Sequence, residues 1–369
     1  MDLCPKDRAR NCKKKRYVVV FNNMKDLFKL TIVILVAIII AVATHFVLYV
    51  VDKSESLKLF QGENQNSSYS SFDPTKPISL LSWNIDNGAY YNPEKEYDYK
   101  LVTSKVVFNN LSRISKTIND ANPDITLLQN IDEYAEKSNR VNEVKYLSSR
   151  LDGNSLAFSY EKINNIYTFE IPFTSRYSGL LLLSKSKSSE PVSYPITPSE
   201  KLTDKVFNHQ PIIQLVRYPI TGTTVMLSVF NINLSRDKVL NDKQLSDILN
   251  IVQKEYRDND NLVVVGGTFN AVLDTKNIPE NASWKPNRLE RKFAELFAQG
   301  WSYICDESNP NTLVYDDMLE EELSYSLDGF LLSPDIKVNG GRMIETRNRP
   351  SSHNPISVNI NINRVARRK

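Results

Sequence analysis

The chain has 369 residues, of which 41% are hydrophobic, and its Lys and Arg outnumber Asp and Glu by 46 to 43. This length and apolar content allow one large folded domain with a substantial core, once an N-terminal anchor is set aside. Residues 1–29 hold nine basic and three acidic side chains, a charge of +6, so the remaining chain has a charge of −3 against the total of +3. The large domain therefore has no overall basic bias that would support nucleic acid as its partner.

Residues 30–51 form a stretch of 22 uncharged, mostly apolar positions, LTIVILVAIIIAVATHFVLYVV. As a helix that rises about 1.5 Å per residue, this stretch is long enough to cross a bilayer. A cleaved signal peptide and a buried soluble helix are the alternatives, but the run is longer than a usual signal-peptide core and no clear small-residue cleavage site ends it. We predict an uncleaved transmembrane helix, which makes the membrane one partner of the protein.

The basic residues of 1–29 precede this helix, and far fewer follow it closely. By the positive-inside rule, 1–29 is a cytoplasmic segment and the large domain is extracytoplasmic, which predicts a single-pass protein of the cell membrane. The three cysteines are Cys4, Cys12 and Cys305. Because the predicted anchor separates the first two from the third, we expect no disulfide within the external domain.

Residues 52–76 are polar and rich in Ser, Asn and Gln, which predicts a flexible linker. The folded domain is predicted at 77–363, and a basic tail at 364–369 follows it. Within the domain, short apolar runs between turn residues predict strands, and apolar residues at helical spacing predict helices. The predicted strands are 78–85, 125–130, 167–169, 180–184, 211–217, 224–231, 262–265, 326–332 and 356–362, and the predicted helices are 105–119, 140–150, 243–256 and 287–299.

Strands outnumber helices in this list, and helices separate several of the strands. The pattern predicts an α/β (α+β) fold in which two β-sheets pack face to face with helices outside. The run 262–265 is apolar and mostly β-branched and ends at Gly266 and Gly267, as expected of a central strand buried on both faces. Thr268 and Asn270 follow where this strand stops, and polar groups at such strand ends are candidates for a functional site.

Polar residues also follow the other predicted strands, in a fixed order. The series is Trp83-Asn84, Gln129-Asn130, Asn231-Ile232-Asn233, Gly267-Thr268-Phe269-Asn270, Leu327-Asp328-Gly329 and Ser352-His353-Asn354-Pro355. Over residues 77–363 it resembles the endonuclease/exonuclease/phosphatase superfamily of metal-dependent phosphoesterases. The stretches WNIDNGAY, SNRVNE, IPFTSRYSGLLLLSK and SLDGFLLSP are similar to a membrane-anchored branch known mainly from low-GC Gram-positive bacteria. The resemblance implies a four-layered α/β sandwich.

The same resemblance implies a chemistry: a divalent cation, Mg²⁺ or Mn²⁺, a water activated by an Asp, and a His that stabilises the phosphoryl oxygens or the leaving group. Carried over position by position, it assigns metal positions to Asn84 and Asn130, and catalytic positions to Asn233, Thr268, Asn270, Asp328, Ser352 and His353. Asn231 and Arg176 are the candidate substrate-binding residues.

Four of these positions depart from the family pattern. Relatives usually have Glu at 130, His at 233 and Asp at 268 and 352, where this chain has Asn130, Asn233, Thr268 and Ser352. Each change removes a charge or a base. Loss of a general base alone typically lowers a rate about 10²–10⁴-fold. Without Asp at 352, His353 is predicted to lack an orienting carboxylate.

Each surviving residue also has a purely structural interpretation. Asn84 and Asn270 would close turns through their side chains, Asp328 would belong to a turn, and His353 to a capped loop. The retained order favours an inherited site instead. The chemistry would be rebuilt if nearby carboxylates replaced the missing ones, and the candidates are Asp86, Asp132 and Asp274. A solvated loop charge is the favoured interpretation of Asp132, and His209 stays unassigned.

Three functions follow from these observations. The first is a membrane-anchored, extracytoplasmic relative of Mg-dependent phosphoester hydrolases that is catalytically impaired or inactive, a pseudoenzyme that serves as a binding domain. The second is an active metal-dependent phosphodiesterase or nuclease with a rebuilt site. The third is recognition of a phosphoester ligand without turnover, with Arg140, Arg176 and Lys185 as candidate cations. Mg²⁺ or Mn²⁺ is expected only if the protein is active, and no cofactor otherwise. The sequence does not identify a protein partner.

Overall fold

The computed structural model describes residues 24–55, 60–63, 71–90, 102–135, 137–151, 155–164, 176–202, 209–274, 278–316, 321–346 and 349–362. The chain divides into two compact units, Met1–Ser54 and Glu55–Lys369. The predicted strand at 167–169, most of the predicted cytoplasmic segment 1–29 and the predicted tail 364–369 lie outside the described residues.

Helix α1 (Met24–Glu55) contains the whole of the predicted transmembrane segment 30–51 and extends beyond it at both ends. The 18 residues from Leu27 to Thr44 are apolar enough to cross a membrane, and none of them is buried within the protein. Exposure of a long helix that is apolar on all sides to water costs free energy, so helices of this composition usually lie in a membrane or in the core of a large protein. The structure thus has one N-terminal helix of the length and composition of a membrane span.

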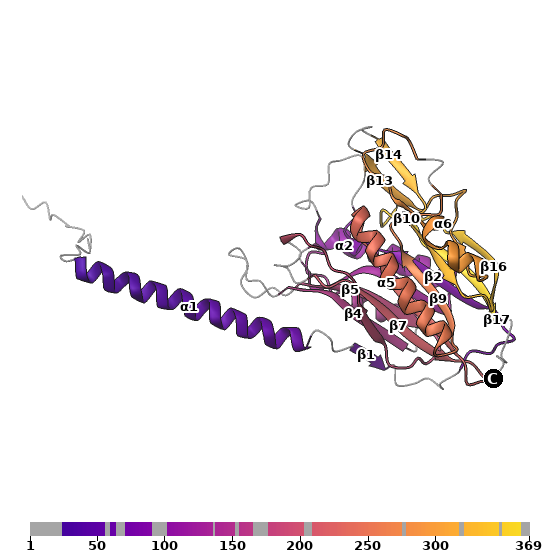
Figure 1. Ribbon diagram of the computed structural model, residues 1–369, viewed down its shortest axis with the longest axis horizontal. Coiled ribbons are helices and arrows are strands. Elements are labelled where there is room, and N and C mark those ends of the chain that lie inside the picture. Colours follow the sequence, from indigo (N-terminus) through magenta and orange to yellow (C-terminus); the bar gives the residue numbers. More distant parts are fainter. Residues whose placement is uncertain are drawn as a thin grey trace, which may run out of the picture. The chain divides into compact units, whose positions relative to one another are not determined.

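The second unit is built on two large mixed β-sheets (Figure 1). The seven-stranded sheet has the order β1-β4-β5-β3-β2-β17-β16, and the six-stranded sheet has the order β12-β15-β9-β8-β7-β6. The strands of the first sheet are β1 (Phe60–Glu63), β2 (Ile78–Asn84), β3 (Ile125–Glu133), β4 (Ser155–Asn164), β5 (Arg176–Ser184), β16 (Ile336–Met343) and β17 (Ile356–Ile362). Those of the second are β6 (Val192–Pro195), β7 (Ile212–Pro219), β8 (Met226–Asn233), β9 (Leu262–Thr268), β12 (Ser302–Ile304) and β15 (Asp328–Leu332).

Two short two-stranded sheets lie beside the large ones: β10 (Ala271–Val272) with β11 (Asn287–Arg288), and β13 (Thr312–Asp316) with β14 (Glu321–Tyr325). A 3-10 turn, η1 (Asp86–Gly88), follows β2. The helices of this unit are α2 (Ser104–Ala121), α3 (Glu143–Ser148), α5 (Lys238–Arg257), α6 (Leu289–Lys292) and α7 (Ala294–Ala298).

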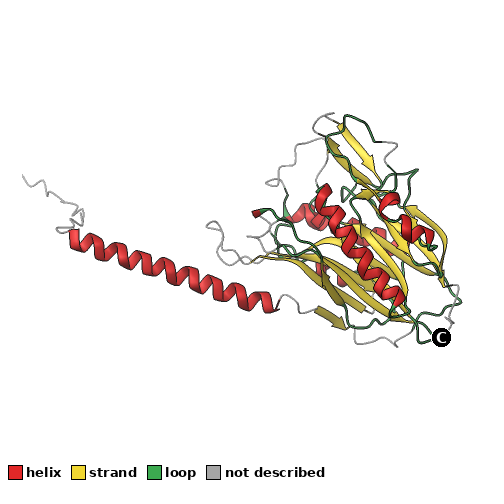
Figure 2. Ribbon diagram, viewed as in Figure 1, coloured by secondary structure: helices red, strands yellow, loops and turns green. Residues whose placement is uncertain are grey.

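Helices cover the outer face of each large sheet (Figure 2). Residues of α2 and α3 share one apolar core with Leu81 and Leu128 of the seven-stranded sheet. Residues of α5, α6 and α7 share another with Val263 and Leu331 of the six-stranded sheet. A third core lies between the sheets. The prediction of two packed sheets with helices outside, a four-layered α/β sandwich, is confirmed.

Strand β9 is the central strand that the run 262–265 predicts, since all seven of its residues are buried. A Cβ at Gly266 would lie 2.6 Å from the ring of Phe330, so only glycine allows the observed packing against that ring. Gly267 has a φ of +142°, and a Cβ there would collide with the carbonyl oxygen of Ile232. The glycine pair therefore permits the close packing that sets the position of Thr268.

Several other predicted elements are found as expected. Strand β17 has the predicted bounds, 356–362. Helix α2 covers the predicted 105–119; its N-terminus is capped by Thr103, and it ends at Asn122, which has a left-handed φ of 49°. This end agrees with the prediction that the Asn-Pro pair closes the helix.

Other predicted bounds are wrong. Strand β3 runs on to Glu133 rather than ending at 130, because an irregularity between Leu128 and Ile131, with Asn130 at a φ of 52°, lets pairing with β5 resume. The predicted helix 140–150 is helical only from 143 to 148. The predicted helix 287–299 is instead the two short helices α6 and α7, which are divided at Phe293.

The folded unit begins before the predicted boundary at residue 77. Phe72 is buried, pairs with Ile220 in an isolated bridge and packs edge-to-face on Tyr218 with ring centroids 5.4 Å apart. Within the predicted linker 52–76, Phe60–Glu63 forms β1 and pairs with β4. The composition of 52–76, rich in Ser and Asn, predicts a flexible linker. Phe60–Glu63 and Phe72 nevertheless form backbone pairs with the folded unit.

A buried carboxylate near the start of β8 gives a prediction about stability. Glu255 accepts hydrogen bonds from Arg217 at 2.7 and 2.8 Å, Ser228 at 2.6 Å, Asn261 at 2.8 Å and Asn259 at 2.6 Å. Burial opposes the charged form of Glu255, but these hydrogen bonds outweigh it and lower its pKa from 4.5 to about 2. The folded state is therefore stabilised by this group above pH 4.5, and the contribution is lost as the pH falls toward 2.

We expect Glu255→Gln to lower the free energy of unfolding by about 1.5–3 kcal/mol at pH 7, because charged hydrogen bonds are lost. Urea denaturation at pH 7 and at steps down to pH 3 measures the free energy of unfolding. We expect the difference in this free energy between wild type and variant to become smaller as the pH falls. Glu295→Gln, at an exposed position of α7, is the matched control. A difference that stays constant over the whole pH range would contradict the prediction.

Candidate functional site

The polar residues at the strand ends lie together at one edge of the sandwich. Strands β2 and β3 run parallel in one sheet, and β8 and β9 run parallel in the other. Asn84, Asn233 and Thr268 are the last residues of β2, β8 and β9, and Asn130 lies at the irregularity within β3. Strand β15 begins beside them, since Asp328 is paired in register with Thr268. The loop before β17 contributes His353, which bridges to Thr312. The fold therefore brings six of the predicted site residues to one place.

These side chains form a continuous chain of hydrogen bonds across the two sheets. Asn233 Nδ2 donates to Asn130 Oδ1 at 3.0 Å, and Asn130 Nδ2 donates to Asn84 Oδ1 at 2.8 Å. Asn84 Nδ2 donates to Thr268 Oγ1 at 3.1 Å, and Thr268 Oγ1 donates to Asp328 Oδ1 at 2.5 Å. Each of these side chains is hydrogen-bonded to the next one, so most of their polar atoms already have a partner within the protein.

This series of hydrogen bonds ends at Asp328, whose carboxylate accepts the last of them. Asp328 is only 2% exposed. Its Oδ2 accepts from Asn311 Nδ2 at 2.7 Å, Thr312 Oγ1 at 3.0 Å and His353 Nδ1 at 2.6 Å. We call the chain together with Asn311, Thr312 and His353 the Asp328 network.

The charge of Asp328 is stabilised by its partners. Burial opposes ionisation, but the His353 charge and the hydrogen bonds from His353, Thr268 and Thr312 outweigh it and hold the pKa of Asp328 below its usual value. The prediction that His353 lacks an orienting carboxylate is therefore wrong. Asp328, which lies on β15, is the carboxylate that orients His353, so an Asp at position 352 is not needed for this purpose.

Ser352 lies at the border of the network and contacts a second carboxylate. Its Oγ donates to Asp86 Oδ2 at 3.3 Å, and Lys137 Nζ lies 3.1 Å from Asp86 Oδ1. The backbone N–H of Asp86 donates to Asn84 Oδ1 at 3.1 Å. Asp86 thus lies next to the network, but its two carboxylate oxygens are held by Ser352 and Lys137.

Asp132 is not the solvated loop charge that was the favoured interpretation, since it is 1% exposed. Because β3 continues past Asn130, Asp132 lies inside the fold, where its Oδ1 accepts from Asn87 Nδ2 at 2.7 Å. Glu143 is fully buried beside it and accepts from the backbone N–H of Asp132 at 2.8 Å. Burial and the nearby Asp132 raise the pKa of Glu143 well above its usual value, which favours a neutral carboxyl group there.

The other predicted site residues lie outside the Asp328 network. Asn270 has a left-handed φ of 49°, and its Nδ2 donates to the carbonyl of Leu234 at 2.6 Å, which is the turn-closing role considered as its alternative. Asn231 is fully buried between the sheets and bonds to Gln129 and Gln214. It is therefore shielded from any ligand in solution. Arg176 begins β5, and its side chain lies outside the described residues.

The remaining candidates are scattered. Asp274 forms an ion pair with Arg288 at 3.0 Å. Lys185 donates to the carbonyl of Asn122 at 2.8 Å, at the end of α2 and thus beside the start of β3 rather than its end. His209 lines a pocket of about 120 Å³ together with Asn130 and Asn233, so the unassigned histidine lies beside the network.

The donor set of the Asp328 network does not fit a divalent cation. Mg²⁺ and Mn²⁺ bind through several oxygen ligands that include carboxylates with open coordination positions. The network has one carboxylate, whose oxygens take four hydrogen bonds from the protein, and the amide oxygens of Asn84 and Asn130 are also occupied. Across the described residues, no group of three or more His, Cys, Asp or Glu side chains is arranged to hold a metal ion.

Sequence reasoning missed Asn311 and Thr312, which precede and begin β13. Their side chains supply two of the four donors to Asp328. The only local signal was the Asn-Pro-Asn-Thr turn composition, which predicts a loop and gives no indication of a partner. The contact depends on an isolated backbone bridge that brings Thr312 beside His353, 41 positions further along the chain.

Comparison with solved structures identifies the fold. An endonuclease/exonuclease/phosphatase from Beutenbergia cavernae is similar at a TM-score of 0.56 and 12% identity, over 78% of this chain and 72% of that one. The catalytic domain of human Nocturnin with a bound sulfate anion is similar at a TM-score of 0.50 and 15% identity, over 82% of this chain and 96% of that one. No protein-family model matches the chain, and no curated protein matches its sequence. The chain has the endonuclease/exonuclease/phosphatase fold.

Proposed function

We propose that this protein is a membrane-anchored, extracytoplasmic member of the endonuclease/exonuclease/phosphatase superfamily that has lost hydrolysis and serves as a binding domain. One observation carries the proposal: Asp328, the one carboxylate of the network, is occupied by four protein donors. A hydrolase of this kind needs carboxylate oxygens that are free to hold a cation and to activate water, and the network offers none, because its one carboxylate is bonded to His353 and to three further donors.

The four departures from the family pattern support the same proposal. Asn130 and Asn233 are neutral amides that bond to each other, and Thr268 bonds to Asp328 where a base would be needed. The second candidate function, an active phosphodiesterase with a rebuilt site, needs further carboxylates beside Asp328. Asp86 and Asp274 are held by Lys137 and Arg288, and Asp132 bonds to Asn87. We therefore favour the inactive site.

The membrane part of the proposal follows from α1 and the charge on either side of it. The apolar segment Leu27–Thr44 suits a membrane span, and the basic residues of 1–29 favour a cytoplasmic N-terminus. Attachment of a reporter cysteine before and after α1, followed by labelling of intact cells with an impermeant reagent, tests the orientation. Labelling of the N-terminal site alone would contradict it.

Hydrolysis by the full-length protein in detergent tests the loss of activity. We expect no turnover of bis(p-nitrophenyl) phosphate above the protein-free rate with either Mg²⁺ or Mn²⁺, because Thr268 stands where the family pattern has the base Asp, and loss of such a base typically lowers a rate about 10²–10⁴-fold. Metal-dependent turnover that disappears in Asp328→Asn but persists in Asp120→Asn, at an exposed position of α2, would overturn the proposal.

A further inference from the structure

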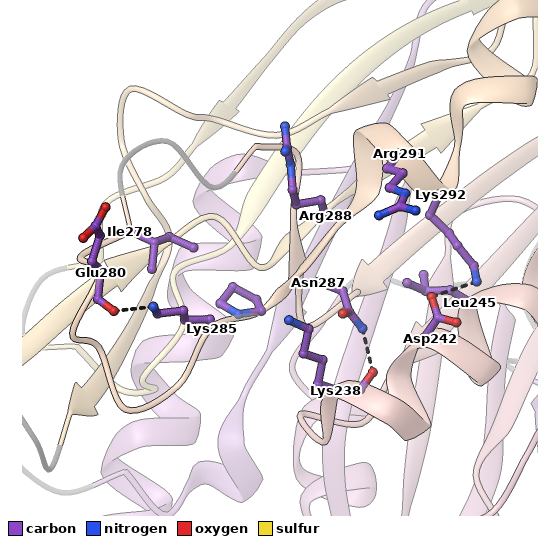
Figure 3. A pocket seen from close by; sticks show the side chains of 11 residues that line it. Lys238, Asp242, Leu245, Ile278, Glu280, Lys285, Asn287, Arg288, Arg291 and Lys292 are labelled. Carbon is purple, nitrogen blue, oxygen red and sulfur yellow. Dashed lines mark hydrogen bonds and ion pairs between the residues drawn. The ribbon is translucent and has the colours of Figure 1, made fainter.

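A second cavity, about 760 Å³ in volume, lies on the helical face of the six-stranded sheet, outside the Asp328 network. Its walls come from the first half of α5, the segment 278–286, β11 and α6 (Figure 3). The volume is within the range of small-molecule sites and much larger than a single inorganic ion needs. From its charge and lining we propose that this cavity binds an organic phosphate.

The charge of the cavity favours an anionic ligand. Five basic residues line the cavity, Lys238, Lys285, Arg288, Arg291 and Lys292, against two acidic residues, Asp242 and Glu280, which leaves a charge of +3. The chain after residue 29 has a charge of −3. The cavity is thus a local concentration of positive charge on a domain of the opposite sign, and such a concentration attracts anions.

Three of these five basic residues are bound to protein partners. Lys292 Nζ lies 2.8 Å from Asp242 Oδ1, and Arg288 lies 3.0 Å from Asp274 Oδ1. Lys285 donates to the backbone carbonyl of Glu280. Within the part of the chain that the structure describes, Lys238 and Arg291 form no ion pair, and Figure 3 shows them on either side of Asn287. These two exposed cations are available to a ligand.

The two remaining side chains, Arg291 and Lys238, suit a phosphate group. The guanidinium of Arg291 can donate two parallel hydrogen bonds to phosphate oxygens, and Lys238 adds a point charge. The start of α5 does not supply the attraction itself, since Asp237 already accepts from the backbone N–H groups of Val239 and Leu240. Ile278 and Pro286 form an apolar part of the wall that suits the organic portion of the ligand. None of these residues belongs to the Asp328 network, so the inference goes beyond the proposed function.

Titration calorimetry of the full-length protein in phosphatidylcholine nanodiscs, with phenyl phosphate as the probe, tests the proposal. We expect saturable binding that is tighter than that of orthophosphate, because the phenyl ring gains the apolar wall. Lys238→Ala with Arg291→Ala should weaken it at least about tenfold. The affinity of Arg291→Lys for phenyl phosphate should lie between those of the wild type and the double variant, because Lys keeps the positive charge but cannot donate two parallel hydrogen bonds. Lys243→Ala, an exposed lysine of α5 outside the cavity, is the matched control and should bind as wild type does.

The source of the phosphate is distinguished by repeating the titration in nanodiscs that contain phosphatidylglycerol. Unchanged binding of phenyl phosphate supports a soluble ligand, and competition by phosphatidylglycerol supports a lipid headgroup. Absence of phenyl phosphate binding, or binding that the Lys238→Ala and Arg291→Ala double variant leaves unchanged, would overturn the proposal. The mutated residues are exposed, so the thermal unfolding of all three variants should match that of the wild type and verify that they fold.

Discussion

Replacing Thr268 with Asp is expected to lower the stability of the protein in metal-free buffer and to make that stability respond to Mn²⁺. Thr268 Oγ1 lies 2.5 Å from Asp328 Oδ1, and both residues are buried. A carboxylate at 268 would therefore face the Asp328 carboxylate at hydrogen-bond distance, where two like charges do not both ionise. We expect a loss of about 3–5 kcal/mol in the free energy of unfolding, as for other uncompensated buried charges.

The same substitution creates two adjacent carboxylates, which is a donor set that a divalent cation favours. Mn²⁺ at about 100 times its dissociation constant would return about 2.7 kcal/mol to the variant, because ligand binding stabilises the folded state. Thr268→Asn is the matched control, because an Asn side chain has nearly the same shape as an Asp side chain but no charge. Thermal unfolding with and without Mn²⁺ measures the effect. A wild-type protein that is stabilised by Mn²⁺ as strongly as the variant would contradict the account.

Removing the Asp328 carboxylate is expected to destabilise the fold. Asp328→Ala leaves four donors without their acceptor: Thr268, Asn311, Thr312 and His353. Breaking a buried charged pair costs about 3–5 kcal/mol, and each buried donor left without a partner adds to the loss. Urea denaturation at pH 7 measures this loss, and Asp120→Ala on the exposed face of α2 should change the stability by less than about 0.5 kcal/mol.

The direction of this effect separates a structural network from a working site. Active sites are often strained, so that removal of a catalytic charge leaves the stability unchanged or raises it. In a network whose polar groups are all hydrogen-bonded to one another, the charge stabilises the fold, so its removal lowers the free energy of unfolding. An Asp328→Ala variant as stable as wild type would therefore indicate that Asp328 is held for chemistry rather than for packing.

Local sequence patterns were enough to predict the elements that meet at the site. The apolar run 262–265 and the glycines after it predicted β9, and this prediction rests on side-chain alternation and on turn residues, which act over a few positions. The convergence of Asn84, Thr268 and Asp328 was instead implied by the resemblance of the ordered strand-end motifs to the superfamily. The structure also has the predicted sandwich, because alternating strands and helices permit few other arrangements.

What local patterns did not predict are contacts between distant strands. His353 finds its carboxylate in Asp328, and Asn311 and Thr312 join them, through pairings that depend on register and on the approach of two sheets. Asp132 appeared solvated because β3 was expected to stop at 130. The left-handed φ of 52° at Asn130 instead lets the strand continue, and no residue type in that stretch requires this backbone conformation.

The claim that the Asp328 network has lost its metal site is tested most directly by titration calorimetry of the full-length protein with Mn²⁺. We expect no saturable heat up to millimolar Mn²⁺, and the same result for Asp328→Asn, because the carboxylate oxygens are already occupied by protein donors. Saturable binding of Mn²⁺ by the wild type that Asp328→Asn abolishes would contradict the account and would identify the network as a metal site.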